Sequence, residues 1–256
     1  KIAGLPAANV SSIRFRVRGG EEVALERLAD EQWRIVEPRR VAANRSRVSG
    51  LLGLLALVPV ASYDKLDTKP EQLGLAEPEA RIWFNESMLV IGGQEPIGGG
   101  RVIQLGNKVH VIYEDEVLSL MKTGARGLAD DRLLPDGDRV STISLPGMQL
   151  TRTDEGWRSE PPSGSDELSA GELAQAWLQA RARFLDWIPI VADDRDNGSA
   201  AGSAVGAPGI EVTLKGGSAY TLHPAGGPDL ATLYRKDLGI SYHLDEALYR
   251  RLLTQP

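Results

Sequence analysis

One sequence pattern occurs twice in this chain, at a spacing of about 130 residues. Val-Ser-Ser-Ile at 10–13 is matched by Val-Ser-Thr-Ile at 140–143, and each begins a stretch of alternating apolar and polar residues that is typical of a strand. The matched residues that follow are Leu25, Arg27 and Trp33 in the first copy and Leu150, Arg152 and Trp157 in the second. Self-similarity of this kind predicts one folding unit that is encoded twice in tandem.

The far ends of the two copies match as well. Residues 113–118 and 243–248 share an arrangement in which an aspartate stands where it caps a short helix. Each copy therefore has the approximate order β-β-α-β-β-β-α. We expect an α+β fold of two tandem repeats, each a mostly antiparallel sheet with one or two helices packed on one face. The first repeat is expected to span residues 1–134 and the second 135–256.

Each copy contains one pattern of an amphipathic helix. In the first, Asn44 is the expected N-cap, and the apolar stripe runs from Val48 to Val58, before Pro59. In the second, Ser169 and Glu172 form a capping box. The apolar stripe of this second helix is Leu173, Ala176, Trp177, Ala180 and Phe184, and Trp187 and Pro189 are expected to end it. Trp33 and Trp157 are expected to be buried in two equivalent cores.

The remaining segments predict strands. They are residues 80–84, 88–91, 101–105 and 109–113 in the first copy, and 210–214, 219–222 and 240–244 in the second. A stretch rich in Ala, Gly, Ser and Asp, about 192–209, is expected to be an irregular insertion within the second repeat.

Composition excludes several classes of function. The chain has 256 residues and no cysteine, which excludes disulfides, thiolate nucleophiles and cysteine-ligated metal clusters. With 29 Lys and Arg against 35 Asp and Glu, the net charge of −6 provides no broad basic field, so we expect no nucleic-acid partner. The longest apolar run, Val48 to Val60, is too short for the roughly 20 residues that cross a bilayer.

Catalytic and metal-binding motifs are absent from the sequence. Its three histidines, His110, His223 and His243, have no spacing typical of a metal site, and no Gly-x-Ser-x-Gly turn presents a nucleophile. The glycine-rich segment 92–101 leads into a strand rather than a helix, so it predicts a hairpin connection and not a phosphate loop. The acidic run 193–198 does not fit a calcium loop, because Arg195 and Ala204 occupy ligand positions. We expect no catalytic residues, metal or cofactor.

Several segments of the first copy together resemble a known family. They are residues 33–38 (WRIVEP), 73–82 (LGLAEPEARI), 89–92 (LVIG) and 126–134 (RGLADDRLL). This set resembles the uncharacterised bacterial family catalogued as domain of unknown function 4340. In the second copy only residues 205–209 (VGAPG) loosely match the Gly-Leu-x-x-Pro element. The resemblance implies an extracytoplasmic protein held by one N-terminal membrane helix and encoded near ABC-transporter or gliding-motility components. That helix would precede Lys1.

A group of side chains in the first copy is the candidate for partner binding. Arg14, Arg16 and Arg18 alternate with apolar residues, which places the guanidinium groups on one face of a strand. Residues 1–50 hold ten positive and six negative charges, a local excess that suits an acidic protein surface or lipid phosphate. Trp83 is next to Phe84, so one of the two rings is expected to be exposed, and Arg101 ends the glycine-rich loop.

These observations favour a non-enzymatic binding module. The family resemblance implies an accessory role at the extracytoplasmic face of the inner membrane, with a partner in a membrane complex that includes ABC-transporter subunits. The alternative is a protein that binds a glycan, a peptide or a small ligand in a cleft between the repeats. A carboxylate brought together with His223 or His243 in a cleft would instead favour an enzyme.

Overall fold

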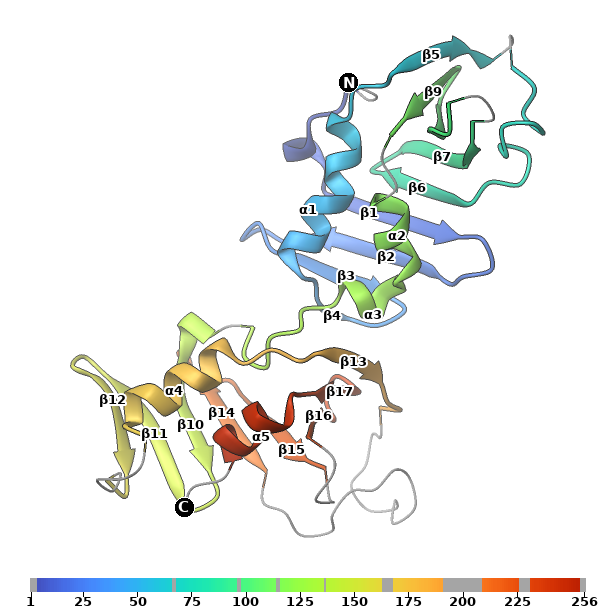
Figure 1. Ribbon diagram of the computed structural model, residues 1–256. Coiled ribbons are helices and arrows are strands. Elements are labelled where there is room, and N and C mark those ends of the chain that lie inside the picture. Colours follow the sequence, from blue (N-terminus) through green and yellow to red (C-terminus); the bar gives the residue numbers. More distant parts are fainter. Residues whose placement is uncertain are drawn as a thin grey trace. The chain divides into compact units, whose positions relative to one another are not determined.

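The structure is a computed structural model that describes residues 4–65, 68–95, 98–113, 116–135, 137–162, 168–190, 209–225 and 231–253 (Figure 1). The chain divides into two compact units, Lys1–Asp130 and Asp131–Pro256. Each unit is built on one large antiparallel sheet with a few short helices, which makes the protein α+β. Most of the expected insertion at 192–209, including the acidic run 193–198, lies outside the described residues.

The first unit contains a nine-stranded sheet in the order β4-β3-β2-β1-β6-β7-β8-β9-β5. The strands are β1 (Ser12–Val17), β2 (Glu22–Arg27), β3 (Trp33–Glu37), β4 (Val41–Ala42), β5 (Ala61–Asp64), β6 (Ala80–Phe84), β7 (Ser87–Gln94), β8 (Arg101–Leu105) and β9 (Lys108–Ile112). The expected strand 80–84 is confirmed to the residue, and β7 and β8 form the expected hairpin. The sequence analysis did not predict β5.

Alternation along the strands builds the core of this sheet. Ile13 and Phe15 on β1 are each 1% exposed, whereas Arg14 between them and Arg16 after them are exposed. Directly paired residues of antiparallel strands project to the same face, so this pattern extends across the sheet. The partners of Ile13 and Phe15 on the neighbouring strands are Leu25, Val23, Phe84 and Ile82, and all of them are buried.

The helical segments with described bounds in the strand-linking parts of this unit include α1 (Arg45–Gly53), η2 (Leu54–Ala56), α2 (Glu116–Lys122) and α3 (Gly124–Leu128). The N-cap prediction is confirmed, because the Asn44 side chain accepts hydrogen bonds from the backbone N–H groups of Ser46 and Arg47. Helix α1 contacts α2, and α2 contacts β1 (Figure 1). The helix ends earlier than expected, and Val58, 74% exposed, does not join its apolar stripe.

A second, smaller core covers part of the face that bears Arg14 and Arg16. Val90, Val102 and Val109 on β7, β8 and β9 are buried together with Leu75, and Leu73 packs against them. The segment 73–75 comes very close to β7: the Gly93 N–H donates to the Leu73 carbonyl at 2.9 Å. A Cβ on Gly92 would lie 2.5 Å from that carbonyl oxygen, and one on Gly74 would lie 2.6 Å from the Gly93 nitrogen. Glycine is therefore required at both positions.

The second unit contains an eight-stranded sheet in the order β12-β11-β10-β14-β15-β16-β17-β13. The strands are β10 (Val140–Leu145), β11 (Met148–Thr153), β12 (Gly156–Glu160), β13 (Phe184–Trp187), β14 (Ile210–Leu214), β15 (Ala219–Pro224), β16 (Thr232–Arg235) and β17 (Ile240–His243). The expected strand 210–214 is confirmed, whereas β13 and β16 were not predicted from the sequence.

The helices of this unit are α4 (Ala170–Gln179) and α5 (Glu246–Leu253). The capping box is confirmed: the Ser169 hydroxyl accepts from the Glu172 N–H, and the Glu172 carboxylate accepts from the Ser169 N–H. The expected extension of α4 to Trp187 is wrong. The helix ends at Gln179, because residues 184–187 pair with β17 as strand β13, and Phe184 is consequently 55% exposed.

The two matched tryptophans have different environments. Trp33 lies on β3, between β2 and β4, and is 7% exposed. Trp157 lies on β12, an edge strand, and is only half-buried, with the Arg152 guanidinium 5.5 Å from its ring centre. The expectation that Trp157 is a core residue is therefore wrong. The fully buried tryptophan of this unit is Trp177 on α4.

The described residues contain no helix that combines the length and the apolar character needed to cross a membrane.

The close contact at Gly92 gives a stability prediction. Gly92→Ala is expected to lower the free energy of unfolding by about 2 kcal/mol, since the added methyl group clashes with a backbone carbonyl that cannot move independently. Gly53→Ala is the matched control, because a Cβ there meets no atom within 4 Å. It is expected to be neutral or slightly stabilising at the end of α1. Urea unfolding followed by circular dichroism measures both, and equal stabilities would contradict the proposed role of Gly92.

Candidate functional site

One row of directly paired residues runs across the first sheet from β2 to β9, and its side chains are charged at the β2 end and apolar at the β9 end. Arg16 on β1 is directly opposite Glu22 on β2 and Arg81 on β6, and Arg81 is opposite Val90 on β7. The row continues through Gln104 on β8 to Val109 on β9. Its apolar end lies under Leu75, and its charged end is exposed. The two arginines therefore lie on an uncovered part of the same face as the second core.

The neighbouring row adds aromatic and apolar surface. Arg14 is opposite Trp83, and Trp83 is opposite Met88, which is 40% exposed. The Arg14 guanidinium lies 4.6 Å from the centre of the Trp83 ring, a cation–π contact that orients both side chains. Trp83 is half-buried and Phe84 is fully buried, so the two adjacent rings differ in exposure, but Trp83 is less exposed than the sequence analysis expected of one of them.

Few carboxylates balance these arginines. Arg14 and Arg16 both approach Glu22, at 4.0 and 3.5 Å, with more than half of each arginine side chain exposed. Within the described residues, Arg81 makes no ion pair. We name this surface the arginine face; it consists of Arg14, Arg16, Arg34, Arg81, Glu22, Glu26, Glu37, Trp83 and Met88. Four arginines against three glutamates leave an excess of one positive charge on it.

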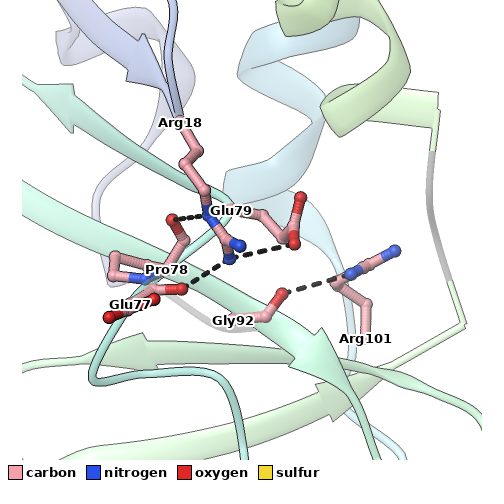
Figure 2. Close-up of polar contacts among 6 residues, drawn as sticks. All are labelled: Arg18, Glu77, Pro78, Glu79, Gly92 and Arg101. Carbon is pink, nitrogen blue, oxygen red and sulfur yellow. Dashed lines mark hydrogen bonds and ion pairs between the residues drawn. The ribbon is translucent and has the colours of Figure 1, made fainter.

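Arg18 closes one end of the arginine face by holding a loop (Figure 2). Its guanidinium donates to the carbonyl oxygens of Glu77 at 2.6 Å and Pro78 at 3.4 Å, and it pairs with the Glu79 carboxylate at 3.0 Å. These contacts fix the segment that enters β6. Arg18, which the sequence analysis predicted to bind a partner, therefore holds residues 77–79 in place.

Arg101 also contacts backbone. Its guanidinium donates to the Gly92 carbonyl oxygen at 3.1 Å, across the β7–β8 hairpin (Figure 2). The side chain is half-buried, and it lies close to the glycine contact that seats residues 73–75. Of the five predicted residues, the structure therefore pairs Arg14 with Trp83 and places Arg16 beside them, while Arg18 and Arg101 hold loops.

His110 on β9 is a buried imidazole with one defined partner. It is 8% exposed, and its Nδ1 lies 2.8 Å from the Ser62 hydroxyl on β5. Burial, and then the positive charge of Lys108, lower the pKa of His110 below its usual value near 6.5. The ring is therefore mostly neutral at pH 7, and its Nδ1 can accept a hydrogen bond from the Ser62 hydroxyl.

His243 on β17 is the centre of a polar group that the sequence did not predict. Its Nδ1 lies 3.2 Å from the Thr232 hydroxyl, and its Nε2 lies 3.1 Å from the Ser241 hydroxyl and 3.4 Å from the Asp186 carboxylate. The Phe184 ring stacks on the imidazole at 4.2 Å with an interplanar angle of 13°. Three strands meet here, and only pairing of the unpredicted strands β13 and β16 with β17 brings these residues together.

Asp186 approaches His243 beside a pocket that His243 and Glu246 line, which is the combination that the sequence analysis named as favouring an enzyme. The arginine face can recognise charge and flat rings. In the part of the chain that the structure describes, no three His, Asp or Glu side chains gather in a way that could hold a metal ion. Comparison of the chain with family models, with curated proteins and with solved structures finds no match.

The lowered pKa of His110 predicts a pH-dependent stability. Below pH 6.5 the unfolded imidazole binds a proton more readily than the folded one, so protons favour unfolding. The stabilisation is present above pH 6.5 and is lost as the pH falls toward the lowered pKa. Urea unfolding of the wild type and of His110→Gln between pH 7.5 and 5.5 tests this. The free energy of unfolding of His110→Gln is expected to depend less on pH than that of the wild type. If both proteins lose stability equally as the pH falls, the assigned role of His110 is contradicted.

Proposed function

We propose that this chain is a non-enzymatic accessory module that binds an acidic surface of a partner protein through the arginine face. The observation that carries the proposal is the positive excess around Trp83 in a chain whose net charge is −6. A local cationic surface on an acidic protein favours a specific acidic partner, since a generally basic protein would attract polyanions at large.

The register of the strands supports this proposal. Arg16 and Arg81 are directly opposite each other, and like charges in that position destabilise a sheet. Carboxylates from a partner would relieve this repulsion and would bind arginine in a bidentate manner. The stacked pair of Arg14 and Trp83, with Met88 beside it, adds the flat apolar surface that is typical of protein interfaces.

We also propose that the two units derive from one duplicated unit with its helices on one face of the sheet. Leaving aside β4, the strand orders correspond: β3-β2-β1-β6-β7-β8-β9-β5 in the first unit and β12-β11-β10-β14-β15-β16-β17-β13 in the second. The register supports the proposed match as well, because Arg27 is opposite Trp33 and Arg152 is opposite Trp157. A helix follows β9 and β17 alike.

The location is proposed from the family resemblance. The module would work at the extracytoplasmic face of the inner membrane, tethered by a membrane helix that precedes this sequence. Its partner would be a subunit of an ABC-transporter-type complex. An accessory protein held beside its partner needs only modest affinity, because tethering raises the effective concentration.

A site-specific crosslink tests the arginine face. A photo-reactive phenylalanine analogue is introduced at Met88, and in a second variant at Glu155, which is exposed in the second unit. In native cells the Met88 variant is expected to crosslink to one membrane-complex protein, and the Glu155 variant is not. Combining Arg16→Glu with Arg81→Glu should reduce the Met88 crosslink at least about tenfold, since each lost pair contributes roughly 1 kcal/mol and repulsion adds to it.

Arg158→Glu is the matched control, because Arg158 is an exposed strand arginine of the other unit. It should leave the Met88 crosslink unchanged. Equal crosslinking from Met88 and Glu155, or a Met88 crosslink that survives both charge reversals, would overturn the proposal. Binding of the wild type to anionic vesicles, lost in the double variant, would assign the arginine face to lipid instead.

A further inference from the structure

The second sheet carries polar side chains where the first sheet carries a buried apolar cluster. In the first unit, Val90 on β7, Gln104 on β8 and Val109 on β9 form one row, and Val102 and Val111 are opposite each other in the next. On β15, β16 and β17 of the second unit, one row is His223, Tyr234 and Ser241, and the next pairs Thr232 with His243. Strand β13 extends these rows with Asp186 and Phe184. The first sheet forms with valines at these places in its rows, so a sheet with this strand order does not need polar side chains there in order to fold.

The contacts of His243 hold its ring in a fixed orientation. Each ring nitrogen has a hydroxyl within hydrogen-bond distance, from Thr232 on one side and Ser241 on the other. Because a hydroxyl can donate or accept, these two contacts suit either tautomer of the ring. Thr232 and Ser241 are 2% and 3% exposed, so these partners do not move freely. An imidazole held in this way is preorganised.

A pocket of about 290 Å³ opens beside this ring. Its lining includes Arg183, Phe184, Thr232, His243, Leu244 and Glu246. Glu246 is paired with Arg250, whereas Arg183 makes no ion pair with any residue that the structure describes. Among the charged side chains that line the pocket, the one without an ion pair in the described part of the chain is therefore Arg183, which is positive. The volume is near the lower end for ligand sites, roughly 300 Å³, and limits the ligand to a small molecule.

We propose that this pocket binds a small aromatic carboxylate. Arg183 supplies the donors for the carboxylate, since its planar guanidinium favours that group, and the fixed ring of His243 forms part of the wall beside it. The exposed ring of Phe184, already stacked on His243, supplies a flat surface for the aromatic body. Asp186 and Glu246 lie close by, so a ligand with one negative charge is favoured over a phosphate with nearly two. This site is independent of the arginine face and does not rest on the function proposed above.

Benzoate is the probe that tests the proposal, with benzamide as its neutral analogue of the same shape. In the ¹⁵N-labelled 256-residue chain, benzoate is expected to shift the backbone amide signals of Arg183, Phe184 and His243, and benzamide is expected to bind at least about tenfold more weakly. Inorganic phosphate should also bind at least about tenfold more weakly than benzoate. Benzamide or phosphate binding as well as benzoate would overturn the proposed class of ligand.

Variants separate binding from folding. Arg183→Ala and Phe184→Ala change exposed side chains, and each is expected to weaken benzoate binding about tenfold with unchanged urea unfolding. His243→Gln keeps a side chain that can bond to the hydroxyls, and tests the imidazole itself. Arg158→Ala is the control that should bind benzoate normally. Full binding by both Arg183→Ala and His243→Gln, or no shift at these residues with wild-type protein, would overturn the proposal.

Discussion

The contact of residues 73–75 with Gly92 and Gly93 is the constraint on which the arrangement of the first unit depends. A large sheet has two faces, and each must be covered by other residues or be polar enough for water. Here the valines of β7, β8 and β9 are covered by Leu73 and Leu75, and the cover comes close enough only because two facing positions have no side chain. Arg18 and Arg101 fix the loops on either side of this contact (Figure 2).

Leu73 and Leu75 cover this face of the first sheet only as far as Val90. The remaining part of the face, which is the arginine face, is exposed, and this is the surface for which we propose partner binding. The row of paired residues begins at Val109, which is buried in the second core, and ends at Arg81 and Arg16, which are exposed. In the second unit, strands β15, β16 and β17 carry imidazole, hydroxyl and phenol groups in their paired rows. Leaving aside β4, one strand order thus carries two different surfaces, and we propose that function resides in those surfaces rather than in the sheets.

Local chemistry was readable from the sequence, whereas long-range pairing was not. Asn44 and Ser169 were predicted as caps because the bonds that they make lie within three residues, and the alternation of β1 fixed which side Arg14 and Arg16 take. Trp157 was placed in a core because burial of an aromatic ring was inferred from its match to Trp33, but it lies on an edge strand. The sequence predicts helix for residues 184–187, because Phe184 and Trp187 continue a helical spacing. They form strand β13 because they pair with β17, and this long-range pairing leaves no local signal in the sequence. The group around His243 was missed for the same reason.

Arginine footprinting tests the central claim, that the open part of the first sheet is a protein-binding surface, most directly. Wild-type protein is treated with phenylglyoxal alone and in native membranes that contain the proposed complex, and modification of each arginine is followed by mass spectrometry. The account predicts that Arg16 and Arg81 become protected in the membranes while Arg158 reacts as before. Equal reactivity of Arg16 and Arg81 in both conditions, with protection elsewhere on the chain, would contradict it.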